Sequence, residues 1–170
     1  VGLVIGVLLA LICRGLLLIF PPLLTAVLIA ITYIMLTGGL HLDGLGDTFD
    51  GIFSNRPKEK ILEIMRDSCH GTNALLAVSS IIVLYIAVIY SIIDQGTALK
   101  ALLLMPVAGR IGSLIGAGVS EYARSGEGMG KAFTDYCSKK EILTGLPFYA
   151  VLFYIIAGFN GLIMITFSSL

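Results

Sequence analysis

Three aspartates, spaced four and then three residues apart, form the group in this sequence with the clearest capacity for chemistry. Asp43, Asp47 and Asp50 would project from one face of a helix, within an arc of about 60°. Like charges at this spacing repel one another, so a cation is expected to offset the repulsion. Mg²⁺ takes carboxylate oxygens together with oxygens of substrate phosphates. The spacing therefore predicts a metal site, with a solvated helix end as the plainer alternative.

Glycines lie between these aspartates and would let a bulky ligand approach the backbone. Gly44 and Gly51 are the two that we expect to contact substrate. His41 falls on the opposite side of the same helix, so we do not expect it to be a ligand. Cys69 and His70 lack further partners at the spacing of a zinc site, so no zinc site is expected.

A short amphipathic helix is predicted after residues 54–57, because proline is favoured in the first turn of a helix. Its polar face carries Glu63, Arg66 and Asp67. If this helix folds back on the acidic stripe, Glu63 and Asp67 would join the metal site and Arg66 would face a phosphate. The alternative is a helix that lies on the membrane surface.

Basic residues further along the chain could bind phosphate. The glycine-rich run 122–133 contains Arg124 and Lys131, but it is not a P-loop, because Ala132 stands where Ser or Thr would contact Mg²⁺. Arg110 lies inside an apolar segment, which indicates either a functional contact or a salt bridge. Acids for Mg²⁺ and basic residues for phosphate together favour phosphoryl transfer, which depends on positioning and charge neutralisation.

Composition indicates that membrane helices position these residues. Of the 170 residues, 57% are hydrophobic and 13% are charged, whereas a soluble domain carries about 25% charged residues. Charged residues are missing from 15–42, 71–93 and 142–170, each longer than the roughly 20 residues that cross a bilayer. Because Lys plus Arg equals Asp plus Glu, no nucleic-acid partner is expected.

We therefore predict an all-α, polytopic integral membrane helical bundle that forms a single membrane domain over 1–170. About five transmembrane helices are expected, and the prolines at 21–22 separate the first two. The acidic stripe would continue the second of these helices. The expected positions are about 1–20, 23–39, 74–93, 98–120 and 143–167.

Two polar stretches should emerge on the same side, because two crossings separate them. Residues 41–73 and 121–142 hold eight of the eleven Lys and Arg, whereas the turn at 94–100 contains only Lys100. By the positive-inside rule this polar cap is cytoplasmic. We expect a protein integral to the cytoplasmic (inner) membrane, in contact with lipid. Within the cap, 41–73 would be the acidic catalytic stretch and 121–142 a glycine-rich basic loop.

Four motifs, in this order and spacing, carry a resemblance to a known family. They are GGLHLDGLGDTFDG, EIMRDSCHGT, the GR at 109–110, and YARSGEGMGKAF. Over nearly the whole chain they closely resemble the cobalamin synthase family (adenosylcobinamide-GDP ribazoletransferase). The resemblance implies an all-helical inner-membrane enzyme of late cobalamin synthesis that requires Mg²⁺. It would join adenosylcobinamide-GDP to α-ribazole or its 5′-phosphate and release GMP. An oligomer, or a complex with other corrinoid-pathway enzymes, is a further expectation.

The resemblance also implies roles for individual residues. Asp43, Asp47 and Asp50 would hold Mg²⁺ on the diphosphate. The catalytic candidates, one of which would act as the base, are Asp47, Glu63 and Asp67. The residues that would neutralise the phosphates and the departing GMP are Arg66, Arg110, Arg124 and Lys131.

The chain departs from the family pattern in two places. Cys69-His70 stands where the family usually has Arg-Ile, so one positive charge is missing, and His70 would partly replace it. The family's C-terminal Gly-x-Thr-Gly-Asp motif is absent, as are the usual residues before Val1. We therefore expect a portion of the enzyme or a short form of it.

Two other functions fit part of the pattern. A CDP-alcohol phosphatidyltransferase shares the Asp-rich helix end, the Mg²⁺ and a nucleoside monophosphate leaving group. Its signature requires Asp-Gly-x-x-Ala-Arg, whereas Asp43-Gly44 is followed here by Gly46-Asp47. A non-enzymatic membrane carrier would more often place its ionisable residues near the bilayer midplane. Here they gather at one end of the apolar segments.

Overall fold

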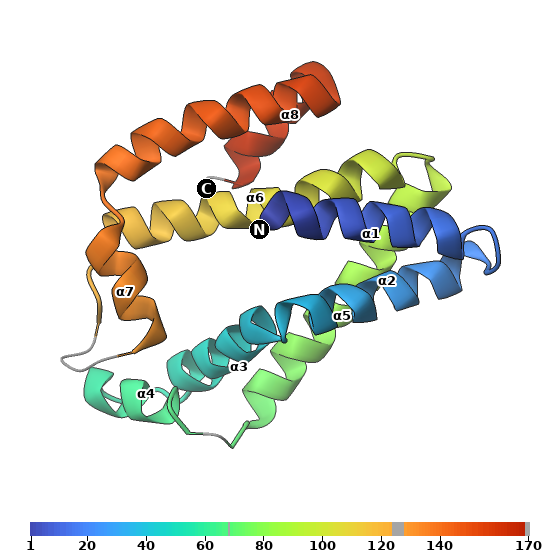
Figure 1. Cartoon of the computed structure of the whole chain (residues 1–170). Coiled ribbons are helices and arrows are strands. Elements are labelled where there is room, and N and C mark those ends of the chain that lie inside the picture. Colours follow the sequence, from blue (N-terminus) through green and yellow to red (C-terminus); the bar gives the residue numbers. More distant parts are fainter. Residues whose placement is uncertain (68, 124–127, 169–170) are drawn as a thin grey trace. The chain divides into compact units, whose positions relative to one another are not determined.

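The computed structural model of the chain describes residues 1–67, 69–123 and 128–168, and the regular elements of these residues are helices (Figure 1). The chain divides into two compact units, one formed by Val1–Leu11 with Leu99–Leu170 and the other by Ile12–Ala98. The helices are α1 (Gly2–Leu16), α2 (Pro22–Thr37), α3 (Leu40–Phe53), α4 (Lys58–Ile64), α5 (Thr72–Asp94), α6 (Ala98–Val119), α7 (Met129–Tyr136) and α8 (Lys139–Ser168).

Three helices within the described residues are long and apolar enough to cross a membrane, namely α5, α6 and the Lys139–Gly161 part of α8. These are the helices expected at 74–93, 98–120 and 143–167. The bent pair of α2 and α3 brings the number to four if it forms one span, while α1 has only 15 residues. The predicted number of about five crossings is therefore not confirmed, whereas an all-helical fold with three to four candidate membrane spans is confirmed.

The acidic stripe lies on α3, which does not continue α2. Gly38 and Gly39 adopt left-handed φ angles of 64° and 70°, and such residues end a helix. The N–H of Gly39 donates to the carbonyl of Ile34 at 3.0 Å and so closes α2. α3 then starts in a new direction, bent by 85° from α2. The expectation that the stripe continues the second membrane helix was wrong, because two successive glycines break the helix at this point.

Within the unit 12–98, both α2 and α3 pack against α5. The rings of Tyr33 on α2 and Tyr85 on α5 lie 5.7 Å apart between centroids. Ala74 and Ala77 are buried on the face of α5 near its start. Because Ala74 is small, α3 approaches α5 closely at Gly46.

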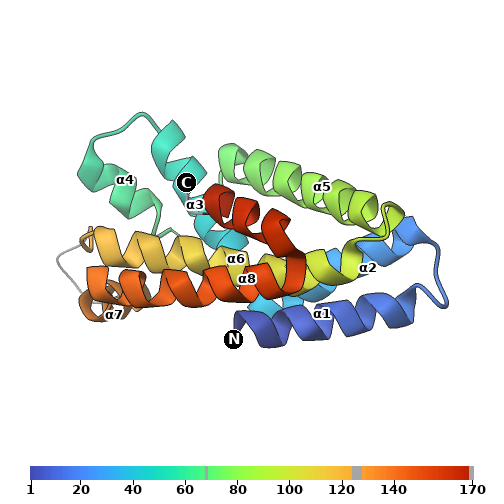
Figure 2. The same ribbon diagram turned by 90° about the horizontal axis from the view of Figure 1, so that it is seen from above.

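Within the other unit, α6 and α8 share an apolar core and run alongside each other (Figure 2). The core consists of Leu104, Val107 and Ile111 from α6 and the fully buried Phe153 from α8. Many other large apolar side chains of α8 are exposed, as expected for a surface that faces lipid.

The first turns of α1 contact the backbone of α6 directly. A Cβ atom added at Gly2 would lie 2.9 Å from the carbonyl oxygen of Pro106, and one added at Gly6 would overlap the carbonyl of Leu103. Small residues four positions apart allow such approach between membrane helices. The Gly2–Gly6 pair therefore sets the distance between α1 and α6.

Gly6→Ala should lower stability, while Gly15→Ala on the same helix should not. A Cβ at Gly6 would collide with backbone atoms, whereas nothing lies within 4 Å of one at Gly15. We expect Gly6→Ala to destabilise the protein by about 1–3 kcal/mol. Gly15→Ala should be neutral, or stabilising by up to roughly 1 kcal/mol through helix propensity. Thermal unfolding in detergent measures both, and equal midpoints would contradict the contact.

Candidate active site

The acidic helix α3 is held against the start of α5 by a close helix crossing. Gly46 is buried, and a Cβ at this position would lie only 3.3 Å from the Cβ of Ala74 and 3.7 Å from the Val78 side chain. The glycine at 46 thus brings the face of α3 that carries Asp50 next to the first turn of α5. The predicted placement of three aspartates on one helix is what the structure shows.

Asp50 accepts hydrogen bonds from the N-terminus of α5 with both carboxylate oxygens. The N–H of Gly71 donates to Oδ2 at 2.5 Å, and the N–H of Ala74 donates to Oδ1 at 2.9 Å. Gly71 is the residue immediately before α5 and offers no side chain of its own as a cap. Asp50 therefore caps α5 from another helix, an interaction typically worth about 1 kcal/mol.

Asp43 pairs with a histidine from the segment before α5. The Oδ1 atom of Asp43 lies 3.8 Å from Nε2 of His70, and both side chains are about half exposed. Because water screens this pair, it contributes little to stability. His70 does stand beside the acidic helix, next to the first aspartate of the stripe.

A cavity of about 720 Å³ opens at this place, between the α2–α3 bend and the start of α5. Its polar lining includes Asp43, His70 and Thr72 together with the backbone of Gly38 and Gly39. Apolar side chains complete the wall, namely Leu40, Leu42, Ala74, Leu75 and Val78. A mainly apolar cavity with a few polar groups is typical of a small-molecule site.

The aspartates do not form a closed metal cage. Among the described residues, no group of three or more His, Cys, Asp and Glu side chains is close enough to hold a metal ion. Asp50 is engaged with backbone N–H groups, and Asp43 and Asp47 are neighbouring carboxylates one turn apart on α3. This arrangement fits a Mg²⁺ ion held by one or two carboxylates and completed by phosphate oxygens, as Mg²⁺ is commonly bound.

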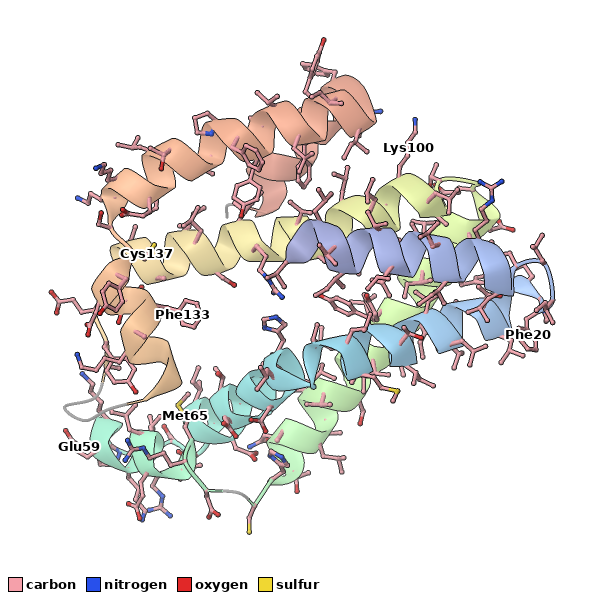
Figure 3. All side chains as sticks on the ribbon, in the orientation of Figure 1. Phe20, Glu59, Met65, Lys100, Phe133 and Cys137 are labelled. Atoms are coloured by element: carbon pink, nitrogen blue, oxygen red, sulfur yellow. The ribbon has the colours of Figure 1, made fainter. Side chains whose placement is uncertain are left out.

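The short helix α4 folds back on α3, but with its apolar face inward. Gly51 lies against Ile61 and Met65, and Figure 3 labels Met65 at the end of α4. Gly51 thus contacts α4, and a Cβ there would lie 2.7 Å from Met65 Cγ, whereas a Cβ at Gly44 would meet nothing within 4 Å. Of the two glycines predicted to contact substrate, only Gly44 has open space beside it.

Among the described residues, the polar side chains of α4 and of the segment that follows it belong to no acidic cluster that could hold a metal ion. Glu63 is exposed and forms a 2.8 Å salt bridge with Lys60. Oδ1 of Asp67 accepts the N–H of Cys69 at 3.1 Å, and Arg66 is exposed. The fold-back that the sequence suggested does occur, but it does not add Glu63 and Asp67 to a metal-binding group.

The remaining predicted phosphate ligands belong to the other unit. Arg110 is half-buried along α6, and Lys131 forms a 2.6 Å salt bridge with Asp135 on α7. Arg124 lies outside the described residues. The role of Asp50 as a cap was missed from the sequence, because nothing in the local pattern pairs position 50 with position 71.

Comparison with known proteins places the chain in one family. The family described as cobalamin-5-phosphate synthase matches residues 1–170. A relative from Clostridium acetobutylicum, named adenosylcobinamide-GDP ribazoletransferase, is 54% identical over 170 residues, which are all of this chain and 67% of the relative. Two relatives with the same name are 56% identical over 96% of the chain (Acetivibrio thermocellus, 66% of its length) and 38% identical over 94% (Clostridioides difficile, 61%).

The chain thus spans about two thirds of the length of these relatives. No solved structure matches it. The motifs that suggested a resemblance lie within the matched region, and the match extends over the helices of both units. The chain belongs to the cobalamin-5-phosphate synthase family.

Proposed function

We propose that this protein is an adenosylcobinamide-GDP ribazoletransferase that uses Mg²⁺. The observation that carries the proposal is identity of 54% over the whole chain to a relative of that name. The cavity beside Asp43 and the neighbouring carboxylates of Asp43 and Asp47 on α3 support it, because they could receive a metal-bound diphosphate. Family membership favours this function over a CDP-alcohol phosphatidyltransferase and over a membrane carrier.

The proposed reaction is a substitution at phosphorus. A hydroxyl oxygen of α-ribazole forms a bond to the phosphorus on the cobinamide side, and the bond from this phosphorus to the GMP oxygen breaks. Mg²⁺ would neutralise charge on the phosphate oxygens when bound. Asp43 and Asp47 would hold the ion, and basic residues such as Arg66 would face the phosphates.

A base must accept the proton of the attacking hydroxyl, and we infer that this base is a carboxylate. Of the candidates on α4 and the segment that follows it, Asp67 is better placed than Glu63. The Asp67 carboxylate accepts a hydrogen bond from the N–H of Cys69, and Cys69 is next in sequence to His70, which lines the cavity. The Glu63 carboxylate instead forms a salt bridge with Lys60. We therefore propose Asp67 as the general base that accepts this proton, with Asp47 as the alternative.

GMP release from adenosylcobinamide-GDP tests this function. Membranes that contain the chain should release GMP only when α-ribazole and Mg²⁺ are both present, beside the Clostridium acetobutylicum relative as a positive control. Asp47→Asn should lower the rate by roughly a hundredfold, because the negative charge that attracts the metal ion is removed. Glu59→Gln, an exposed acid on α4 (Figure 3), is the matched control and should keep the rate. No release from folded protein, while the relative is active, would refute the proposal.

The polar cap should face the cytoplasm, and native cysteines can report it. Cys69 is exposed in the acidic stretch, whereas Cys13 is buried. In a Cys137→Ser variant, a membrane-impermeant maleimide should label Cys69 in inside-out vesicles and not in intact cells. Thr97→Cys, in the exposed turn between α5 and α6, should show the reverse pattern once Cys69 is also replaced by Ser. Labelling of Cys69 in intact cells would contradict the orientation.

A further inference from the structure

Asp50 differs from Asp43 in what its carboxylate contacts. Asp43 lines the cavity and faces the His70 side chain. Both oxygens of Asp50 accept backbone N–H groups at the N-terminus of α5, those of Gly71 just before the helix and Ala74 in its first turn. One helix face thus supplies two aspartates to different kinds of partner.

The residue at position 71 is fitted to this contact. Gly71 has an ordinary extended backbone with φ −84°, so its conformation does not require glycine. A Cβ at this position would instead lie 2.8 Å from Oδ1 of Asp50 and 3.1 Å from its Cγ. The Asp50 carboxylate occupies the space that a side chain at position 71 would need. Glycine at this position therefore allows the carboxylate to reach the N–H groups of Gly71 and Ala74.

We propose that Asp50 is a positioning residue that fixes the N-terminus of α5, and that it is not a ligand of the metal. By holding Gly71, Asp50 places the adjoining His70 and Thr72 at the cavity, beside Asp43. This revises the set of three metal ligands suggested by the sequence to two, Asp43 and Asp47. The part of the proposal that concerns the metal rests on the proposed function.

Electrostatics separate the two roles. The start of the 23-residue helix α5 carries partial positive charge, which already compensates the Asp50 carboxylate. A divalent cation bound to the same carboxylate would lie next to that positive helix end, where it is disfavoured. Asp43 instead faces the His70 side chain and lines the cavity, so the cation is better placed at the end of α3 that carries Asp43.

Amide hydrogen exchange of the chain in lipid nanodiscs tests the contact without any assay of activity. Asp50→Ala removes both acceptors, and exchange across residues 70–76 should become roughly fivefold to thirtyfold faster. Asp50→Asn keeps one acceptor oxygen and should show a smaller increase. Gly71→Ala should resemble Asp50→Ala, because the added methyl group displaces the carboxylate. Gly44→Ala, on the same helix in open space, is the control and should leave this segment unchanged.

The Mg²⁺ requirement for GMP release tests the second part. Asp50→Asn should lower the maximal rate while the half-saturating Mg²⁺ concentration stays within about twofold of the native value. Asp47→Asn should raise that concentration by about tenfold or more, because a charged oxygen ligand is replaced by a neutral one. A loss of folded protein would lower the maximal rate but would not raise the half-saturating Mg²⁺ concentration, so the Mg²⁺ requirement is the readout that separates Asp47 from Asp50.

Two results would overturn the proposal. Exchange of residues 70–76 that is unchanged in both Asp50→Ala and Gly71→Ala would show that the contact does not hold α5. A half-saturating Mg²⁺ concentration raised as far in Asp50→Asn as in Asp47→Asn would make Asp50 a ligand. If the unmodified protein releases no GMP, the proposed function fails, and the exchange measurement still decides whether Asp50 holds α5.

Discussion

The crossing of α3 over the start of α5 is the contact on which the candidate site depends. Gly46 meets Ala74 at this crossing, and one turn later Asp50 receives two N–H groups of α5. Apolar packing sets the distance between the helices, and the charged cap fixes their register. The cavity and the Asp43–His70 pair lie beside this crossing, because His70 directly precedes Gly71, whose N–H Asp50 accepts.

Close approach through glycine recurs in the chain. The carbonyl groups of α6 occupy the space beside Gly2 and Gly6, and Met65 occupies the space beside Gly51. Lipid is as apolar as leucine, so helices in a membrane gain little by hiding apolar side chains from it. Packing and hydrogen bonds at short range supply the association instead, which explains why small residues decide these contacts.

Much of the architecture could be predicted from the sequence, because hydropathy over about 20 residues is a strong signal. The helices α5 and α8 lie where charge-free segments predicted them, and α6 lies where the apolar segment around Arg110 predicted it. The motif around Asp43 and Asp47 indicated the family, and comparison confirmed it. The bend at Gly38 and Gly39 was missed, because glycine is common in membrane helices and its φ angle is not visible in composition.

Contacts between residues that are distant in sequence could not be predicted from the sequence pattern, for another reason. Helical periodicity assigns a residue to a face but does not identify the neighbour of that face. Asp50 was therefore grouped with Asp43 and Asp47, although its partners come from α5. The same uncertainty applied to α4, whose apolar face turned out to contact α3 and left Glu63 to pair with Lys60.

The 85° bend between α2 and α3 has a consequence for the depth of the carboxylates. In a straight helix along the membrane normal, Asp43 and Asp50 would differ in depth by about 10 Å, at a rise of 1.5 Å per residue. After the bend, a helix that follows an upright α2 lies nearly parallel to the bilayer plane, and the difference falls to about 1 Å. The aspartates then lie at the same depth in the bilayer and in the same dielectric environment. A diphosphate at any position along α3 would therefore be hydrated to the same extent.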